Sequence, residues 1–245
     1  MNVTQKWTKF LAVGCSHGSH ISQSAREAVL AFRDRYNPSE IIHLGDAIDC
    51  TALRGGAIKD STSGDHSVDL ADDFETGICF LKELRPTIYM LGNHEHRLYA
   101  LLNSSSAIIS YAAERGVEEI EKQMKKLHCR VFPYDIEKGV VILGGTAFLH
   151  GFAFSENAVR DTVESLGRPI IMAHLHRPEI QRGRVISSPV GMCVGTLADI
   201  GAMTYARQRR ATLRWQHGFA WGEYSSKGCV AWLATPTGGE WRLPV

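Results

Sequence analysis

The sequence lacks the features that would place it in a membrane. Among its 245 residues there is no uninterrupted apolar run of about 18 residues, so no transmembrane helix is expected. The first eight residues are polar and carry no apolar stretch of the kind found in signal peptides. We therefore expect a cytoplasmic protein that makes no membrane contact.

Cysteine occurs, but never in a pattern that holds a small domain together. None of the six cysteines forms a C-x-x-C pair and their spacing is irregular. Neither a disulfide framework nor a structural zinc knuckle is expected. Internal repeats and low-complexity tracts are also missing, which excludes solenoid and low-complexity proteins.

The sequence also has no excess of charge of one sign. The 27 basic and 26 acidic residues give a formal net charge of +1, which argues against a protein that binds nucleic acid through its overall charge. One local basic stretch, residues 207–210, could face solvent, a partner or a phosphate chain. The length and ordinary composition fit one α/β domain.

Five short apolar runs each end in a polar cluster. The runs predict buried strands, and helical spacing between them predicts helices at 22–36, 67–84 and 155–166 and two more within 97–127. Strands that alternate with helices indicate an α/β fold with a largely parallel sheet. The clusters are, in chain order, Gly14-Cys15-Ser16-His17, Gly45-Asp46-Ala47-Ile48-Asp49, Gly92-Asn93-His94-Glu95, His150-Gly151 and His174-Leu175-His176.

The C-terminal part has a different pattern. Residues 184–194 and 211–243 predict antiparallel strands that complete a second sheet, with turns at 224–228 and 235–239. We expect a single domain over residues 1–245. Within it we expect a helical insertion at about 66–127 and a C-terminal antiparallel strand region at about 184–245.

The polar clusters predict a metal site. Ligands of α/β sheets bind beyond the carboxyl ends of the strands, where all five clusters lie. Five such clusters are improbable as mere turns, because buried polar groups need partners. Imidazole and oxygen donors together suit Zn²⁺, Mn²⁺ or Fe ions. A single Asp between two sets of ligands can bridge two ions, which can clamp a phosphate and activate water.

The motifs, in this order, resemble those of the calcineurin-like metallophosphoesterases over residues 9 to about 195. Residues 45–49 match G-D-x-x-D, and residues 92–95 match G-N-H-[DE]. Residues 173–176 match G-H-x-H with Ala173 in place of glycine, and His150 stands where the family has a lone histidine. The resemblance implies a four-layer α-β-β-α sandwich of two mixed sheets flanked by helices. It also implies two divalent ions of Mn, Zn or Fe.

The resemblance assigns a role to each residue of the site. The metal ligands would be His17 and His176 for the first ion, Asp46 for both, and Asn93, His150 and His174 for the second. A metal-bridging hydroxide would attack the phosphorus of the substrate, a phosphate ester. His94 would protonate the leaving oxygen, and Asp49 would orient His94. Glu95 would support the loop, and Arg97 would either neutralise phosphate charge or simply be exposed.

Cys15 departs from the family pattern, because the family has an aspartate at this position in D-x-H. As a thiolate, Cys15 would be a softer first-site ligand and would favour Zn²⁺ or Fe over Mg²⁺. As a neutral thiol, it would leave the first ion weakly bound. A cysteine nucleophile is the third alternative, but the metals already supply a nucleophile. Of the three alternatives, we favour the one in which Cys15 is a thiolate ligand of the first ion.

The substrate is a phosphodiester or a phosphomonoester in our interpretation. Cys50 and Thr51 stand where the protein serine/threonine phosphatase branch has arginine and glycine, which argues against that branch. Two alternatives stay open, namely a DNA exonuclease or endonuclease of the same superfamily and a non-catalytic metal-binding scaffold. Residues 51–65 are expected to form a mobile loop over the site. Nothing in the sequence indicates a particular oligomeric state.

Overall fold

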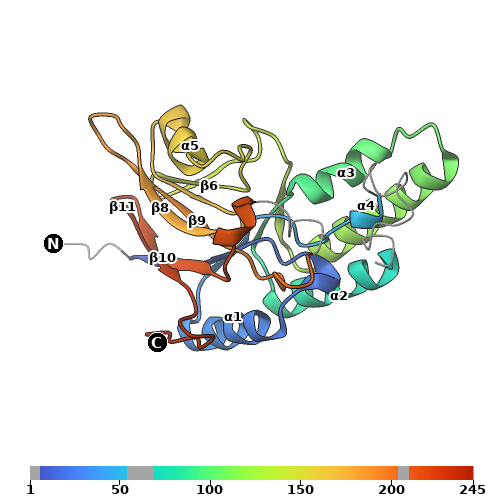
Figure 1. Ribbon diagram of the computed structural model, residues 1–245, viewed down its shortest axis with the longest axis horizontal. Coiled ribbons are helices and arrows are strands. Elements are labelled where there is room, and N and C mark those ends of the chain that lie inside the picture. The colour runs from blue at the N-terminus through green and yellow to red at the C-terminus, as the bar shows by residue number, and fades with distance from the viewer. Residues whose placement is uncertain (1–5, 54–68, 204–209, 245) are drawn as a thin grey trace.

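Two mixed sheets lie face to face between helices in a computed structural model of the chain, which describes residues 6–53, 69–203 and 210–244 (Figure 1). The first sheet contains β1 (Thr8–Val13), β2 (Glu40–His43), β3 (Ile88–Met90), β4 (Arg130–Phe132), β10 (Phe219–Ser225) and β11 (Gly228–Ala234). Its strand order is β11-β10-β1-β2-β3-β4. The strands run parallel from β1 to β4, whereas β10 pairs antiparallel with both β1 and β11.

The second sheet has the order β5-β6-β7-β9-β8. Its strands are β5 (Val141–Leu143), β6 (Thr146–Leu149), β7 (Ile170–Met172), β8 (Pro178–Arg182) and β9 (Val190–Val194). The central strands β6, β7 and β9 are parallel, and antiparallel strands close both edges. The carboxyl ends of the parallel strands in both sheets therefore provide the loops that carry the predicted site.

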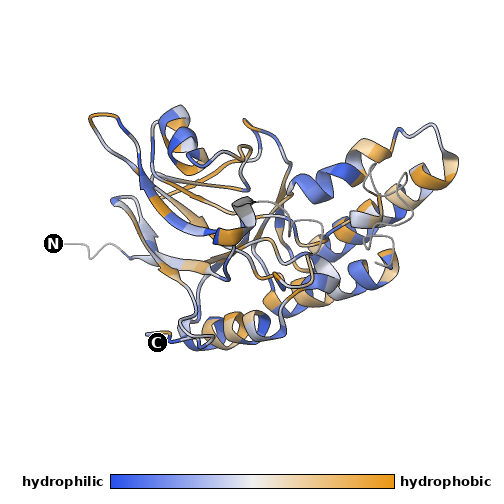
Figure 2. Cartoon of the chain, viewed as in Figure 1, coloured by the Kyte–Doolittle hydropathy of each residue, from blue (hydrophilic) through white to orange (hydrophobic). Residues whose placement is uncertain are grey.

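Helices cover the outer faces of the two sheets. The α-helices of the described residues are α1 (Gln23–Tyr36), α2 (Leu70–Leu84), α3 (Asn93–Leu101), α4 (Ala107–Lys126) and α5 (Ala158–Leu166). Figure 2 shows alternating hydrophobic and hydrophilic bands along α1 and α2, as expected for helices that bury one face. The N-cap of helix α2 is Asp69, whose side chain accepts the Ala71 N–H, and its C-cap is Arg85, just before Pro86. Within the described residues, no helix combines the length and hydrophobicity needed to cross a bilayer.

The side chains of β1 point alternately to the two faces of the first sheet, and each face packs against a different layer. Phe10 and Ala12 face the second sheet, and Phe10 packs edge-on against Phe148 of β6. Leu11 and Val13 point the other way, into the cluster formed with α1. Because neighbouring strand residues face opposite sides, one strand builds two cores. A further core joins the second sheet to α5, so the predicted four-layer sandwich of two mixed sheets is confirmed.

The structure corrects the prediction for the C-terminal strands. The strands β10 and β11 are antiparallel, but they extend the first sheet beside β1 instead of completing the second. The strand β9 does lie in the second sheet, where it pairs antiparallel with β8 and parallel with β7. Apolar alternation identifies a strand but not its partner, so the sequence pattern could not distinguish the two sheets. The single domain with its insertion at 66–127 stays a prediction. The predicted loop at 51–65 and the basic stretch at 207–210 lie largely outside the described residues.

Candidate metal centre

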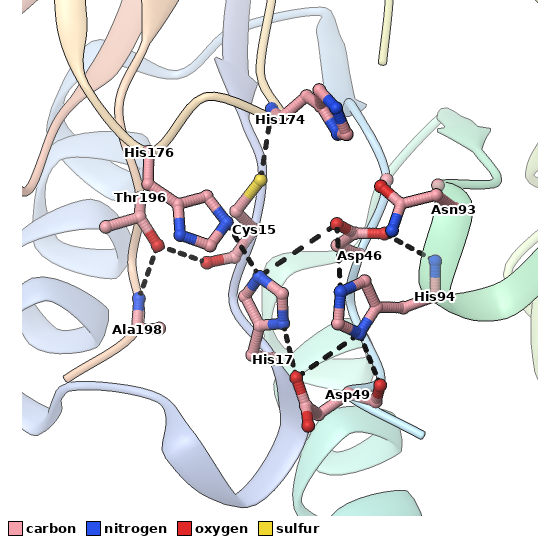
Figure 3. A network of polar contacts seen from close by, with 12 residues as sticks. Cys15, His17, Asp46, Asp49, Asn93, His94, His174, His176, Thr196 and Ala198 are labelled. Carbon is pink, nitrogen blue, oxygen red and sulfur yellow. Dashed lines mark hydrogen bonds and ion pairs between the residues drawn. The ribbon is translucent and has the colours of Figure 1, made fainter. Parts of the chain in front are cut away.

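The side chains predicted from the motifs come together at the carboxyl ends of β1, β2, β3, β6 and β7. Figure 3 shows those that follow β1, β2, β3 and β7. They are buried or nearly so, and each contacts at least one other member of the set. The connected set consists of Cys15, His17, Asp46, Asp49, Asn93, His94, His150, His174 and His176. Both sheets contribute, because β6 and β7 belong to the second sheet and the other three strands to the first.

Asp46 lies at the centre of this set. Its Oδ2 is 3.3 Å from Nε2 of His150, 3.9 Å from Nε2 of His94 and 4.0 Å from Nε2 of His17. Its other oxygen accepts the backbone N–H of His94 at 2.9 Å. Burial acts to raise the pKa of Asp46, but the surrounding imidazoles outweigh burial and hold this pKa well below its usual value. Asp46 is therefore a carboxylate that faces several histidines at once.

His17 presents a lone pair to the interior of the site. Its Nδ1 lies 2.7 Å from Oδ1 of Asp49, and because a carboxylate only accepts, the ring donates from Nδ1. Its Nε2 is left as the acceptor and lies 3.0 Å from Nε2 of His176. A carboxylate behind the imidazole is the usual support of a metal-ligating histidine.

His150 is oriented in the same manner from the second sheet. Its Nδ1 donates to the carbonyl oxygen of Leu44 at 2.7 Å, which leaves Nε2 free to bind a cation. Nε2 lies 3.1 Å from Oδ1 of Asn93 and 3.1 Å from Nδ1 of His174. An amide oxygen and two ring nitrogens thus converge beside Asp46.

The donor atoms fit divalent cations. Two groups, each with donor atoms within 4.8 Å of one another, share Asp46: Cys15, His17, Asp46 and His176 form one, and Asp46, His150 and His174 form the other. Among the described residues, neither Nε2 of His174 nor Nδ1 of His176 has a hydrogen-bond partner, although both atoms are buried. Burial lowers the pKa of His174 to about 3 and that of His176 well below its usual value. Both rings are therefore neutral bases, the form that binds metals.

Cys15 lies in the first donor group and is fully buried. Its Sγ accepts the backbone N–H of His174 at 3.2 Å. Burial and the nearby charge of Asp46 raise the pKa of the Cys15 thiol well above its usual value, despite this hydrogen bond. Without a cation the sulfur is a thiol, whereas a bound cation would favour the thiolate. The structure describes all six cysteines as free, in line with the predicted absence of disulfides.

His94 is buried and lies in the first turn of α3. Its Nδ1 donates to the carbonyl oxygen of Asp49 and lies 3.3 Å from the Asp49 carboxylate, whose closer imidazole partner is His17. Burial acts to lower the pKa of His94, but Asp46 and Asp49 outweigh it and raise this pKa to about 9. Arg97 is half-buried beside it, with Nη1 3.3 Å from Nδ1 of His94.

Glu95 holds the surrounding loops in place. Its buried carboxylate accepts five hydrogen bonds, from the N–H groups of Asp46, Ala47, Ile48 and Gly92 and from the hydroxyl of Tyr89. These donors lie in the loops after β2 and β3 and in β3 itself. The expected supporting role of Glu95 follows from these contacts, which orient the backbone on both sides of Asp46.

The loops are strained, and one glycine is required. Cys15, His17, Asp46, His174 and His176 all have left-handed φ angles between 53° and 71°, a conformation concentrated at functional sites. A Cβ added to Gly92 would lie 2.0 Å from Oδ1 of Asp46. Only glycine allows the loop after β3 to approach the central carboxylate this closely.

Sequence reasoning missed several supporting residues. Asp73 of α2 is buried and accepts the N–H groups of Asp49 and Cys50. Thr196 donates its hydroxyl to the carbonyl oxygen of Cys15 at 2.7 Å (Figure 3). Asp73 is a polar residue inside an apolar helical pattern, which was a usable signal, but nothing near Thr196 in the sequence pointed to this contact.

A sandwich of two mixed sheets with buried imidazole, carboxylate and thiol donors at the strand ends defines a class of metal-binding hydrolases. The chain belongs to the calcineurin-like phosphoesterase family, whose model matches residues 8–192. It is accordingly a hydrolase that acts on phosphate esters.

Solved structures similar to this chain differ strongly from it in sequence. A conserved Streptococcus pneumoniae TIGR4 protein, described as a predicted phosphoesterase, is 16% identical, with 95% of this chain and 91% of that chain covered and a TM-score of 0.41. Yfce, a phosphoesterase from E. coli, is 13% identical, with 87% of each chain covered and a TM-score of 0.42. Vps29 from Chaetomium thermophilum is 11% identical, with 94% and 88% covered and a TM-score of 0.46. No curated protein matches the chain in sequence.

Proposed function

We propose that the protein hydrolyses phosphate esters with two divalent cations that share Asp46. The observation that carries this proposal is the membership of Asp46 in both buried donor groups, one of which reaches to His176 and the other to His174. A carboxylate offers two oxygens with lone pairs on separate sides, so one side chain can serve two cations.

The remaining donors divide between the two positions. The first ion would be held by Cys15, His17 and His176, and the second by Asn93, His150 and His174. Imidazole, carboxylate and thiol donors together favour Zn²⁺, Mn²⁺ or Fe over Mg²⁺. Such ions neutralise phosphate charge and activate water when they are bound.

His94 would act as the general acid. Its Nδ1 is held by Asp49, so the proton available for transfer is the one on Nε2, which faces the Asp46 side of the site. Without bound cations, Asp46 and Asp49 raise the pKa of His94 to about 9, so the ring of the metal-free protein is protonated at neutral pH. As the bond from phosphorus to the leaving oxygen breaks, the Nε2 proton passes to that oxygen and the imidazole becomes neutral.

Metal analysis combined with turnover tests the proposal. The purified protein should bind two Zn²⁺ or Mn²⁺ ions per chain and hydrolyse p-nitrophenyl phosphate or bis-p-nitrophenyl phosphate when these ions are added. Asp46→Asn should weaken binding of both ions, because one side chain contributes to both donor groups. Single- and double-stranded DNA assayed in parallel would detect nuclease activity. Less than one bound ion per chain and no turnover with any divalent ion would favour a non-catalytic scaffold.

A further inference from the structure

Two aromatic side chains contact the two histidines that follow β7. The ring of Phe154 lies 4.4 Å from the ring of His174, and the ring of Trp215 lies 4.5 Å from the ring of His176, measured between centroids. Phe154 is 73% exposed, whereas the two histidines are buried. A large apolar ring is thus left in solvent directly against a proposed metal ligand.

We propose that Phe154 and Trp215 form an aromatic rim that binds a planar aromatic group attached to the substrate phosphate. The inference rests on the proposed function, because His174 and His176 would fix the phosphate beside the rim. Aromatic faces stack on planar rings of any substitution, and exposed apolar patches at a reactive site commonly mark the ligand surface. The substrate class is therefore an ester whose phosphate carries an aryl group or a nucleoside.

The segment that carries Phe154 is fixed rather than loose. Arg177 directly follows His176 and is only 3% exposed. Its Nη2 donates to the carbonyl oxygens of Ser155 at 2.9 Å and Glu156 at 3.1 Å. A buried guanidinium with two backbone acceptors just after Phe154 holds the backbone of this segment in place, and the Phe154 ring lies against His174.

Trp215 is held from the same side. The N–H of the next residue, Gln216, donates to the carbonyl oxygen of His176 at 2.9 Å. The preceding residue, Arg214, forms an ion pair with Glu156 at 2.9 Å between Nη2 and Oε1. The two ring-bearing segments lie about 60 residues apart in the chain, yet Glu156 connects to both through Arg177 and Arg214.

The two rings of the rim are in position before the substrate binds. They can therefore bind the group that stays attached to phosphorus during the reaction. The imidazoles of His174 and His176 belong to the metal centre and contact the two rings of the rim. A substrate ring stacked on the rim would therefore lie next to the bound phosphate. Rings already held in place lose little conformational freedom when a ligand stacks on them. An ester with a methyl group in the same position would bind the cations but leave the rim uncovered.

Three diesters with a common leaving group test the rim. Methyl p-nitrophenyl phosphate, bis-p-nitrophenyl phosphate and thymidine 5′-p-nitrophenyl phosphate all release p-nitrophenolate and differ in the retained group. We expect kcat/KM to be about 5- to 100-fold higher for at least one aromatic diester than for the methyl diester. The better of the two aromatic diesters identifies whether the source is an aryl ester or a nucleotide.

Variants of Phe154 and Trp215 separate stacking from general packing. Phe154→Ala and Trp215→Ala should each reduce the preference ratio, and the double variant should bring it near one. Phe154→Tyr, which keeps the ring, should retain the preference, whereas Phe154→Leu should lose most of it. Ile186→Ala, at an exposed hairpin position, serves as the control for an unrelated apolar surface residue.

The outcomes distinguish this inference from the proposed function. Turnover of all three diesters at equal rates, or an unchanged preference in the double variant, would overturn the rim and leave the metal-dependent reaction intact. No turnover of any diester with any divalent ion would also overturn the rim, and the proposed function would fail with it only if p-nitrophenyl phosphate were not hydrolysed either. Metal content measured for every variant shows whether a lost preference reflects a lost ion.

Discussion

The sulfur of Cys15 accepts the backbone N–H of His174 at 3.2 Å, so the loop after β1 and the loop after β7 meet at this hydrogen bond. The bond stabilises the thiolate form of Cys15, but burial and Asp46 act against it and keep the metal-free sulfur protonated. The protonation state of Cys15 therefore depends on whether a cation binds at the first position.

Cys15→Asp is expected to keep activity and to shift metal preference from Zn²⁺ toward Mn²⁺ or Mg²⁺, because a carboxylate oxygen is a harder ligand than sulfur. The measurement is kcat/KM for bis-p-nitrophenyl phosphate after the metal-free protein is reloaded with each ion. Cys79→Ser, which changes an exposed thiol on α2, is the matched control. A variant with the wild-type metal profile would argue against thiolate ligation.

His94→Ala is expected to keep its metal ions and to lose turnover by about 100-fold or more, since the general acid is removed while the metal donors stay. Steady-state rates and metal content measured on the same preparation check this expectation. His96→Ala, two residues along α3 and exposed, should have nearly wild-type rates. Rates within a few-fold of wild type for His94→Ala would remove the assigned role.

Glu95→Gln is expected to lower the free energy of unfolding by about 3–5 kcal/mol. The amide NH₂ would face backbone N–H groups that now donate to a carboxylate oxygen. Tyr89→Phe removes only one of the five hydrogen bonds and should cost about 1 kcal/mol. Urea unfolding of the metal-free proteins measures both values, and equal losses would contradict the central role of Glu95.

His43 is expected to make the metal-free fold sensitive to acid. It is buried, its Nδ1 accepts the Gly45 N–H, and burial lowers its pKa from 6.5 to about 3. Below pH 6.5 His43 binds a proton in the unfolded chain, whereas in the folded chain it stays neutral down to about pH 3. The stability contributed by neutral His43 is therefore complete above pH 6.5 and falls with pH by up to about 1.4 kcal/mol per unit.

The substitution His43→Gln keeps a polar side chain and removes this titration. Urea unfolding between pH 4.5 and 7 should show a shallower dependence of the unfolding free energy on pH in the variant. Parallel curves for the wild type and the variant would show that another group carries the dependence.

The sequence predicted those parts of the fold that follow local patterns. The helix expected at 22–36 is α1, which has clear helical periodicity, and the apolar run expected before the His150-Gly151 cluster is β6. The strands β4 and β5 were missed because each is short and, unlike the equally short β3 and β7, is not followed by one of the five polar clusters. The strand β8 was missed because its residues, P-E-I-Q-R, are mostly polar and lie at an edge of the sheet.

The site followed the same rule. The motif residues lie together at one end of the sheets, as the order of strands and polar clusters along the chain predicted, while their roles as ligands stay a prediction. The contacts of Thr196 with Cys15 and of Phe154 with His174 join segments that no spacing connects. The first contact arises from the packing of the two sheets and the second from the pairing of β6 with β7, and a single sequence displays neither.

The donors come from both halves of the sandwich, since Asp46 and Asn93 follow strands of the first sheet and His150 and His174 follow strands of the second. A cation pair that binds them all would crosslink the two halves. Because the two sheets would have to stay in place to bind the cations, the cations would bind only the folded protein. The melting temperature should therefore rise as the concentration of free metal increases. Removal of the cations by a chelator would lower the melting temperature of both sheets. Thermal denaturation would therefore report how much of the metal centre is occupied.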